Sequence, residues 1–147
     1  MSLRPQRIAA RPRSPFDRIG GRAAVASLVG RFYDRMDGNP AYRDLRAIHA
    51  DDLDPMRERL TDFLVGWMGG PRDWFDRNPG ACIMSAHAAM PGIDRRTAEQ
   101  WIGCMEEAME DVAARDPALA RALLDSMRSM SLSMAKRAAA GAEPGQP

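Results

Sequence analysis

The sequence predicts an all-α protein with one domain, and three observations support this prediction. No stretch alternates polar and apolar residues as a strand does, and β-branched residues are scarce. Apolar residues instead recur at spacings of three and four, which is the period of a helix face. Pro, Gly, Ser and Asp stand at the ends of these stretches. A length of 147 residues, 45% of them hydrophobic and 28% charged, fits one domain with room for one enclosed ligand pocket.

The first helices have clear boundary signals. Ser14, followed by a proline, favours the start of a short helix that Gly20-Gly21 ends. A second helix is predicted over 21–36, before the helix-ending Gly38-Asn39-Pro40. A short helical or irregular stretch then leads to a helix over 53–68, which Gly69-Gly70-Pro71 ends.

The second half of the chain begins with a segment rich in helix breakers. Pro and Gly residues divide 71–92, leaving room for one brief helix around 81–88. Asp94 is expected to cap a long helix over 94–113, and Asp116-Pro117 to open a last one over 117–138. The domain is therefore expected over 14–138, with a disordered basic tail at 1–13 and a flexible tail at 139–147.

Charge and cysteine content exclude several classes of partner. The formal net charge of +1 gives no general attraction for nucleic acid or an anionic membrane, and no apolar run approaches the ~18 residues that span a bilayer. We therefore expect no nucleic acid and no membrane as partners. Two cysteines, Cys82 and Cys104, are too few for a disulfide framework, so both are expected to be buried thiols in a cytoplasmic protein.

The two histidines are the candidate metal ligands. Neither His49 nor His87 has a second ligand at a zinc-finger spacing, so a zinc site is not expected. His87 lies on a short segment between helix breakers, with apolar neighbours from Ile83 to Met90. One axial nitrogen in an apolar slot suits haem iron.

Over residues 16–134 the sequence resembles a known family, the group II truncated haemoglobins. The matching pieces occur in the family's order and at nearly its spacings. They are Ile19-Gly20-Gly21, Leu28-Val29, Phe32-Tyr33, Leu45-Arg46, His49, Asp52-Leu53, Phe63-Leu64, Trp67, Gly69-Gly70-Pro71, His87, Trp101 and Cys104-Met105.

The resemblance implies a truncated globin-like two-over-two helical sandwich that encloses one haem b (iron protoporphyrin IX). Its pairs would be 21–36 with 53–68, and 94–113 with 117–138. By position, His87 matches the proximal iron ligand. Tyr33, His49 and Trp101 match the distal residues, whose polar groups would hydrogen-bond a diatomic ligand. The cofactor-binding positions would be Met56 and Leu60, which face the iron, and Phe32, Phe63, Leu64 and Met105, which line the porphyrin.

The implied function is binding of O2 and other diatomic gases, such as CO and NO, at a five-coordinate haem. Buried donors should slow ligand escape, which favours sensing, scavenging or catalysis over transport. NO-detoxifying or peroxidase-like redox chemistry with an unidentified reductase is compatible with this family. The protein is expected as a monomer or homodimer.

Two departures from the family pattern concern the proximal side. Many members carry arginines just before the proximal histidine, where they reach the haem propionates, whereas this chain has none there. Arg57, Arg59, Arg95 and Arg96 are possible substitutes. The interval from His87 to Trp101 is also one residue longer than usual, which a loop at Pro91-Gly92 would absorb.

Each site residue also has an ordinary structural interpretation. Tyr33 and Trp101 are compatible with core aromatics whose polar tips reach the surface, and His49 with a loop residue that contacts Asp51 or Asp52. The alternative function is a haem-free helical interaction or signalling domain of globin-like fold. Colour in the purified protein separates the two hypotheses.

Overall fold

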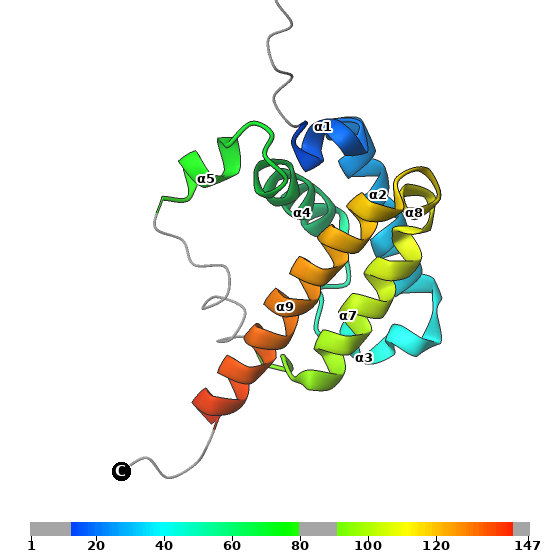
Figure 1. Ribbon diagram of the computed structural model, residues 1–147. Helices are drawn as coiled ribbons and strands as arrows, with labels where there is room; N and C mark the ends of the chain where they lie inside the picture. Colours follow the sequence, from blue (N-terminus) through cyan, green and yellow to red (C-terminus); the bar gives the residue numbers. More distant parts are fainter. Residues whose placement is uncertain (1–12, 80–90, 143–147) are drawn as a thin grey trace, which may run out of the picture.

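The computed structural model describes residues 13–79 and 91–142, and every regular element within these ranges is helical (Figure 1), which confirms the all-α prediction. The helices are α1 (Pro15–Ile19), α2 (Arg22–Gly38), η1 (Pro40–Tyr42), α3 (Arg43–Ala47), α4 (Asp54–Trp67), α5 (Asp73–Arg77), α7 (Arg95–Ala108), α8 (Glu110–Arg115) and α9 (Pro117–Ala142). None of these helices is long and apolar enough to cross a membrane.

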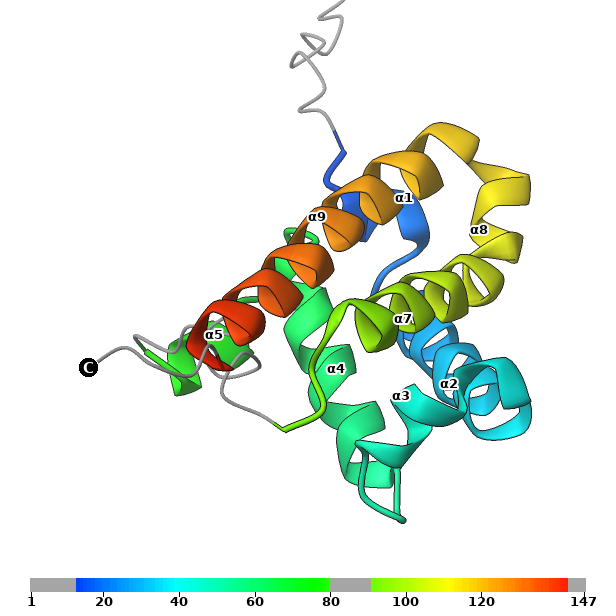
Figure 2. The same ribbon diagram turned by 90° about the horizontal axis from the view of Figure 1, so that it is seen from below.

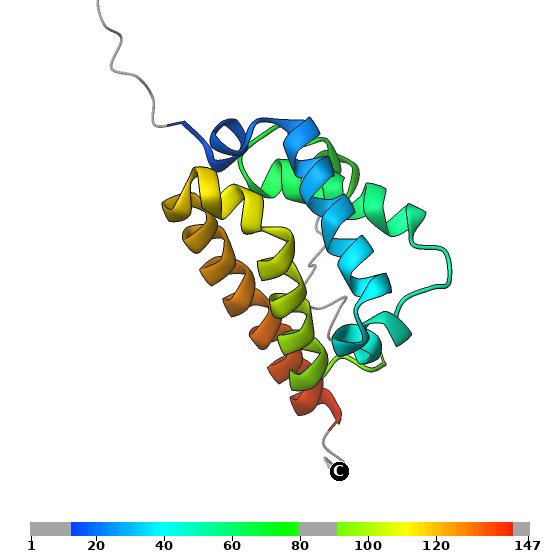
Figure 3. The ribbon, with the colours of Figure 1, turned by 90° about the vertical axis from the view of Figure 1, so that its right-hand side faces the viewer.

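The long helices form two packed pairs, α2 with α4 and α7 with α9, and α2 also contacts α7. Figure 3 shows α7 and α9 running antiparallel, with α2 crossing α4 beside them. This is the predicted two-over-two arrangement. Fully buried side chains from all four helices meet in one core, among them Leu28, Phe32, Leu64, Met105 and Leu119. Figure 2 shows the short α3 next to α2 and α7, both of which it contacts.

Three of the predicted helix starts have the capping contacts that the sequence indicates. The Ser14 hydroxyl accepts a hydrogen bond of 3.1 Å from a backbone N–H in α1, and the left-handed Gly20 (φ 115°) ends this helix. At the start of α7, Asp94 and Thr97 form a reciprocal capping box of 2.9 and 3.0 Å. The Asp116 carboxylate accepts from a backbone N–H in the first turn of α9 at 3.1 Å.

The helices differ from the prediction in three main ways. The single helix expected over 94–113 is wrong, because α7 ends at Ala108 and α8 begins after Met109. The Met109 N–H is shared between the carbonyls of Met105 and Glu106 (2.9 and 3.2 Å), which tightens the turn there. The second difference is α5, which lies in the stretch 71–92, where the sequence predicts only one brief helix, around 81–88. Residues 81–88 lie outside the described residues, so that prediction stays untested. Finally, α9 continues to Ala142 instead of ending at 138.

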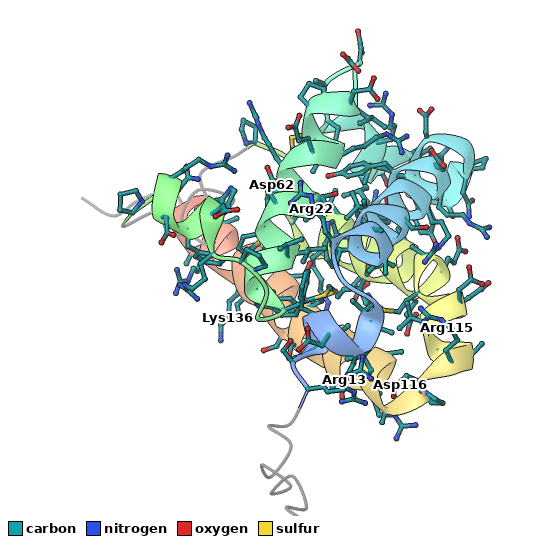
Figure 4. All side chains as sticks on the ribbon, turned by 90° about the horizontal axis from the view of Figure 1, so that it is seen from above. Arg13, Arg22, Asp62, Arg115, Asp116 and Lys136 are labelled. Atoms are coloured by element: carbon teal, nitrogen blue, oxygen red, sulfur yellow. The ribbon has the colours of Figure 1, made fainter. Side chains whose placement is uncertain are left out.

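Ion pairs attach the small helices to the long ones. Arg18 on α1 forms a bidentate pair with Asp116 at the start of α9, with distances of 2.9 to 3.2 Å. Asp62 on α4 pairs with Arg22 at the start of α2, and the two residues lie next to each other in Figure 4. Asp62 also accepts from Arg77 on α5 at 3.4 Å. Figure 1 shows α5 on the side of α4 that faces away from α2.

Candidate functional site

The predicted distal side chains come together around Phe32, a fully buried residue on α2. The Tyr33 ring packs edge-on against Phe32 with centroids 5.0 Å apart, and the Trp101 ring reaches Phe32 from α7 at 5.2 Å. On its other side Tyr33 meets His49, with ring centroids 6.0 Å apart. Residues that are far apart in the sequence therefore share one aromatic cluster between α2, α3 and α7. We call it the distal cluster after its predicted role, and its members are Phe32, Tyr33, His49 and Trp101.

Tyr33 is a donor enclosed in this cluster. Only 2% of its surface is exposed, so the interpretation with a polar tip at the surface is wrong for this residue. Burial raises the pKa of Tyr33 above its usual range, while the charge of Arg57 acts in the opposite direction. The hydroxyl is therefore protonated at neutral pH and available as a donor. Trp101 is only half-buried.

His49 has a defined tautomer. Its Nδ1 lies 2.8 Å from the carbonyl oxygen of Leu45, and because a carbonyl only accepts hydrogen bonds, Nδ1 carries the proton. In the neutral ring Nε2 then has a lone pair and acts as an acceptor.

The α3 segment that leads to His49 is held by α7. The Gln100 side chain accepts a hydrogen bond from the Leu45 N–H at 2.9 Å and donates to Asp44 at 2.9 Å. Gln100 directly precedes Trp101, so the same turn of α7 holds the segment that leads to His49 and presents Trp101. No pattern in the sequence distinguishes Gln100, because a polar residue on an amphipathic helix carries no local signal of such a contact.

Apolar side chains from α2, α4 and α7 accompany the distal cluster. Phe32, Phe63, Leu64 and Met105, which were expected to line the porphyrin, are buried in the core. Met56 and Leu60 on α4 are partly buried and pack against the same core. Each therefore leaves some apolar surface that the described helices do not cover. Uncovered apolar surface on α4, together with the buried hydroxyl of Tyr33 on α2, is compatible with a large flat apolar group and a small polar ligand.

The residues expected on the proximal side are only partly within the described ranges. His87 and Cys82 lie outside them, while Cys104 is buried and its thiol lies 3.1 Å from the Phe32 carbonyl. Three arginines considered for the propionates form ion pairs with neighbouring acids. These are Arg57 with Asp34 (2.8 Å), Arg95 with Glu99 (3.1 Å) and Arg96 with Asp44 (3.9 Å).

A two-over-two helical sandwich with aromatic hydrogen-bond donors between its pairs is the architecture of a truncated globin. A model of the family described as bacterial-like globin matches residues 14–136. The group 2 truncated hemoglobin YjbI of Bacillus subtilis is 28% identical over 99 residues, which cover 67% of this chain and 71% of that protein.

Solved structures agree with this match. The cold-adapted truncated hemoglobin of Pseudoalteromonas haloplanktis TAC125 has a TM-score of 0.77 and 28% identity, covering 83% of this chain and 97% of that one. The group II 2-on-2 hemoglobin of Agrobacterium tumefaciens has a TM-score of 0.76 and 26% identity, covering 86% and 97%. The chain belongs to the bacterial-like globin family. The resemblance to group II truncated haemoglobins is thereby confirmed, and membership of this family implies haem binding and gas binding.

Proposed function

We propose that the protein binds one haem b and holds O2, and similarly CO and NO, against the hydrogen-bond donors Tyr33 and Trp101. The observation that carries this proposal is the packing of both rings around Phe32, at 5.0 and 5.2 Å between centroids. Haem supplies the iron that binds diatomic gases. The chain supplies the apolar enclosure and the donors.

In this proposal the donors act differently from His49. Tyr33 offers an O–H and Trp101 an indole N–H, and each of these groups can donate a hydrogen bond to a polar ligand. His49 donates from Nδ1 to the Leu45 carbonyl, so this nitrogen is not available to the gas.

The remaining site residues hold the cofactor. Met56, Leu60, Phe63 and Leu64 on α4 and Met105 on α7 would contact the porphyrin and exclude water, together with Phe32. His87 would provide the axial nitrogen. Redox chemistry on NO or peroxide would additionally require electrons from a reductase, so reversible gas binding is the simpler proposal for the chain alone.

Absorbance spectra of the purified, haem-supplemented protein test this proposal. We expect a Soret band, and we expect His87→Ala to lose the five-coordinate ferrous spectrum until imidazole is added. The matched control is His49→Ala, which should retain that spectrum. A colourless wild type would favour the haem-free interaction domain. An unchanged spectrum in His87→Ala would mean that another residue is the axial ligand.

A further inference from the structure

Arg57 on α4 is fixed in place by contacts to α2. Its guanidinium donates to the Gly30 carbonyl at 3.1 Å and to the Asp34 carboxylate at 2.8 Å, and it lies 3.7 Å from Asp54 on its own helix. Three contacts in different directions leave the planar group little freedom. The side chain is 30% exposed, so it is partly shielded from solvent.

The same guanidinium lies over the ring of Tyr33, with its central carbon 5.8 Å from the ring centroid. Gly30, Tyr33 and Asp34 are three and four residues apart on α2 and so lie on one helix face. Both anchors of Arg57 therefore hold the cation where it meets the tyrosine. The Asp34 side chain is 72% exposed, so water screens its opposite charge more than it screens the charge of Arg57.

We propose that Arg57 is a positioning residue for the distal tyrosine: its cation fixes the ring of Tyr33 and strengthens the hydroxyl as a donor to the bound gas. This inference rests on the proposed function of Tyr33. A cation over the face of a phenol withdraws electron density through the ring, so the O–H bond becomes more polar. The direction agrees with the effect of the Arg57 charge on the pKa of Tyr33, which is to lower it.

The expected size follows from the strength of a cation–π contact. Losing the cation in Arg57→Gln should speed O2 release about two- to fivefold, with a smaller effect on CO. Arg57→Lys keeps the charge and should restore part of the loss. Arg128→Gln on α9, where the side chain is half-exposed and 3.9 Å from Glu106, is the matched control for loss of one positive charge. It should leave both rates unchanged.

A double-mutant cycle separates this role from general support of α4. If Arg57 acts through the tyrosine, Arg57→Gln should change O2 release in the wild type but not in Tyr33→Phe. An equal change in both backgrounds would overturn the inference. If Tyr33→Phe alone leaves O2 release unchanged, this contradicts the proposed function of Tyr33 instead. Fluorine NMR of a label on Tyr33 then still decides whether Arg57 acts on this ring.

A second measurement needs no bound gas, because it observes Tyr33 directly through a fluorine label. The chain has only two, so Tyr42→Phe with fluorotyrosine incorporated leaves one fluorine label, at position 33. Fluorine NMR of the haem-loaded protein at neutral pH should show a shifted resonance of the labelled Tyr33 in Arg57→Gln and a smaller shift in Arg57→Lys, because the cation over the ring changes its electron density. Cys104 and His49, the other titratable groups near this ring, are the same in all variants. An unchanged fluorine chemical shift in Arg57→Gln would refute the inference. If Arg57→Gln fails to fold, Asp34→Asn releases one anchor and should broaden or shift the same fluorine signal.

Discussion

Replacing Trp101 by Phe is the most direct test of the proposed hydrogen bond from its indole N–H to the bound gas. The change keeps an aromatic ring beside Phe32, with which Trp101 now packs at 5.2 Å between centroids, and removes only the indole N–H and one ring. Loss of a donor to a partly charged acceptor costs ~1.5–3 kcal/mol. At ~1.4 kcal/mol per decade, O2 release should become roughly ten- to a hundredfold faster if the loss appears in escape.

The lost packing predicts a much smaller effect. Trp101 is half-buried and the new Phe keeps most of the aromatic contact, so the packing loss should be only a fraction of the ~0.5–1.5 kcal/mol of an aromatic pair. That loss should also act on every ligand alike. CO carries far less charge separation than O2, so its release should change little when only a donor is removed.

Stopped-flow measurement of O2 and CO dissociation separates these effects. Trp67→Phe on α4 is the matched control, because Trp67 is also half-buried against the core but does not belong to the distal cluster. Tyr33→Phe should act in the same direction as Trp101→Phe but more weakly, and the double variant should be non-additive because both donors share one acceptor. Equal and small changes for O2 and CO would refute the hydrogen-bond interpretation of Trp101.

Three further predictions concern the frame around the site. In Gly70→Ala a Cβ would lie 2.7 Å from an aromatic ring carbon and 2.8 Å from a carbonyl oxygen, so the free energy of unfolding should fall by ~1–3 kcal/mol. In Gly30→Ala the Cβ would meet no such neighbour within 4 Å, so the free energy of unfolding should rise by up to ~1 kcal/mol. Thermal unfolding measures both changes, and changes of the same sign would contradict this prediction. A backbone N–H of α9 and the guanidinium on α1 lower the pKa of Asp116, so its stabilising contribution is present above about pH 3.9 and is lost as the pH falls through the lowered value. The stability difference from Asp116→Asn in urea should therefore shrink in acid, and a pH-independent difference would count against the ion pair. Burial raises the pKa of Cys104 to about 12, so in a Cys82→Ser background iodoacetamide at pH 8 should label the unfolded chain much faster than the native one.

The sequence indicated helix ends well where one side chain determines them. Ser14, Asp94 and Asp116 each cap the helix that follows, because a short polar side chain next to a free backbone N–H is a local signal. The turn at Met109 has no such signal. No Gly or Pro marks it, and apolar residues continue on both sides at helical spacing, so only the packing of a fully buried side chain reveals it.

The helix α5 was missed for a related reason. Its five residues lie between prolines, which favours a loop interpretation, and none of them is fully buried. It is stabilised by tertiary contacts instead: Trp74 and Phe75 pack on Phe63 of α4 at 5.2 and 5.7 Å between ring centroids. Local propensity contains no information about such contacts, because they depend on where α4 lies.

The candidate site shows the same division between local and long-range information. The identities of Tyr33, His49 and Trp101 came from a family resemblance, since no local pattern distinguishes them from ordinary core aromatics. Arg57 had been considered for the propionates, and its position over Tyr33 depends on how α4 crosses α2. A sequence pattern along one helix does not specify that crossing.

The distal cluster is held in place by several neighbouring elements. The Arg57 cation on α4 lies over Tyr33, the Leu45 carbonyl of α3 accepts from His49, and Gln100 ties α3 to the turn of α7 that presents Trp101. Donors that are oriented before a ligand arrives lose little conformational entropy when it binds, so each hydrogen bond contributes more to retention. Because different elements provide these supports, a change in one of them should weaken the donor it holds without dispersing the cluster. If the proposed function holds, the affinity for a polar gas should therefore vary through residues that never touch the gas, while the fold stays the same.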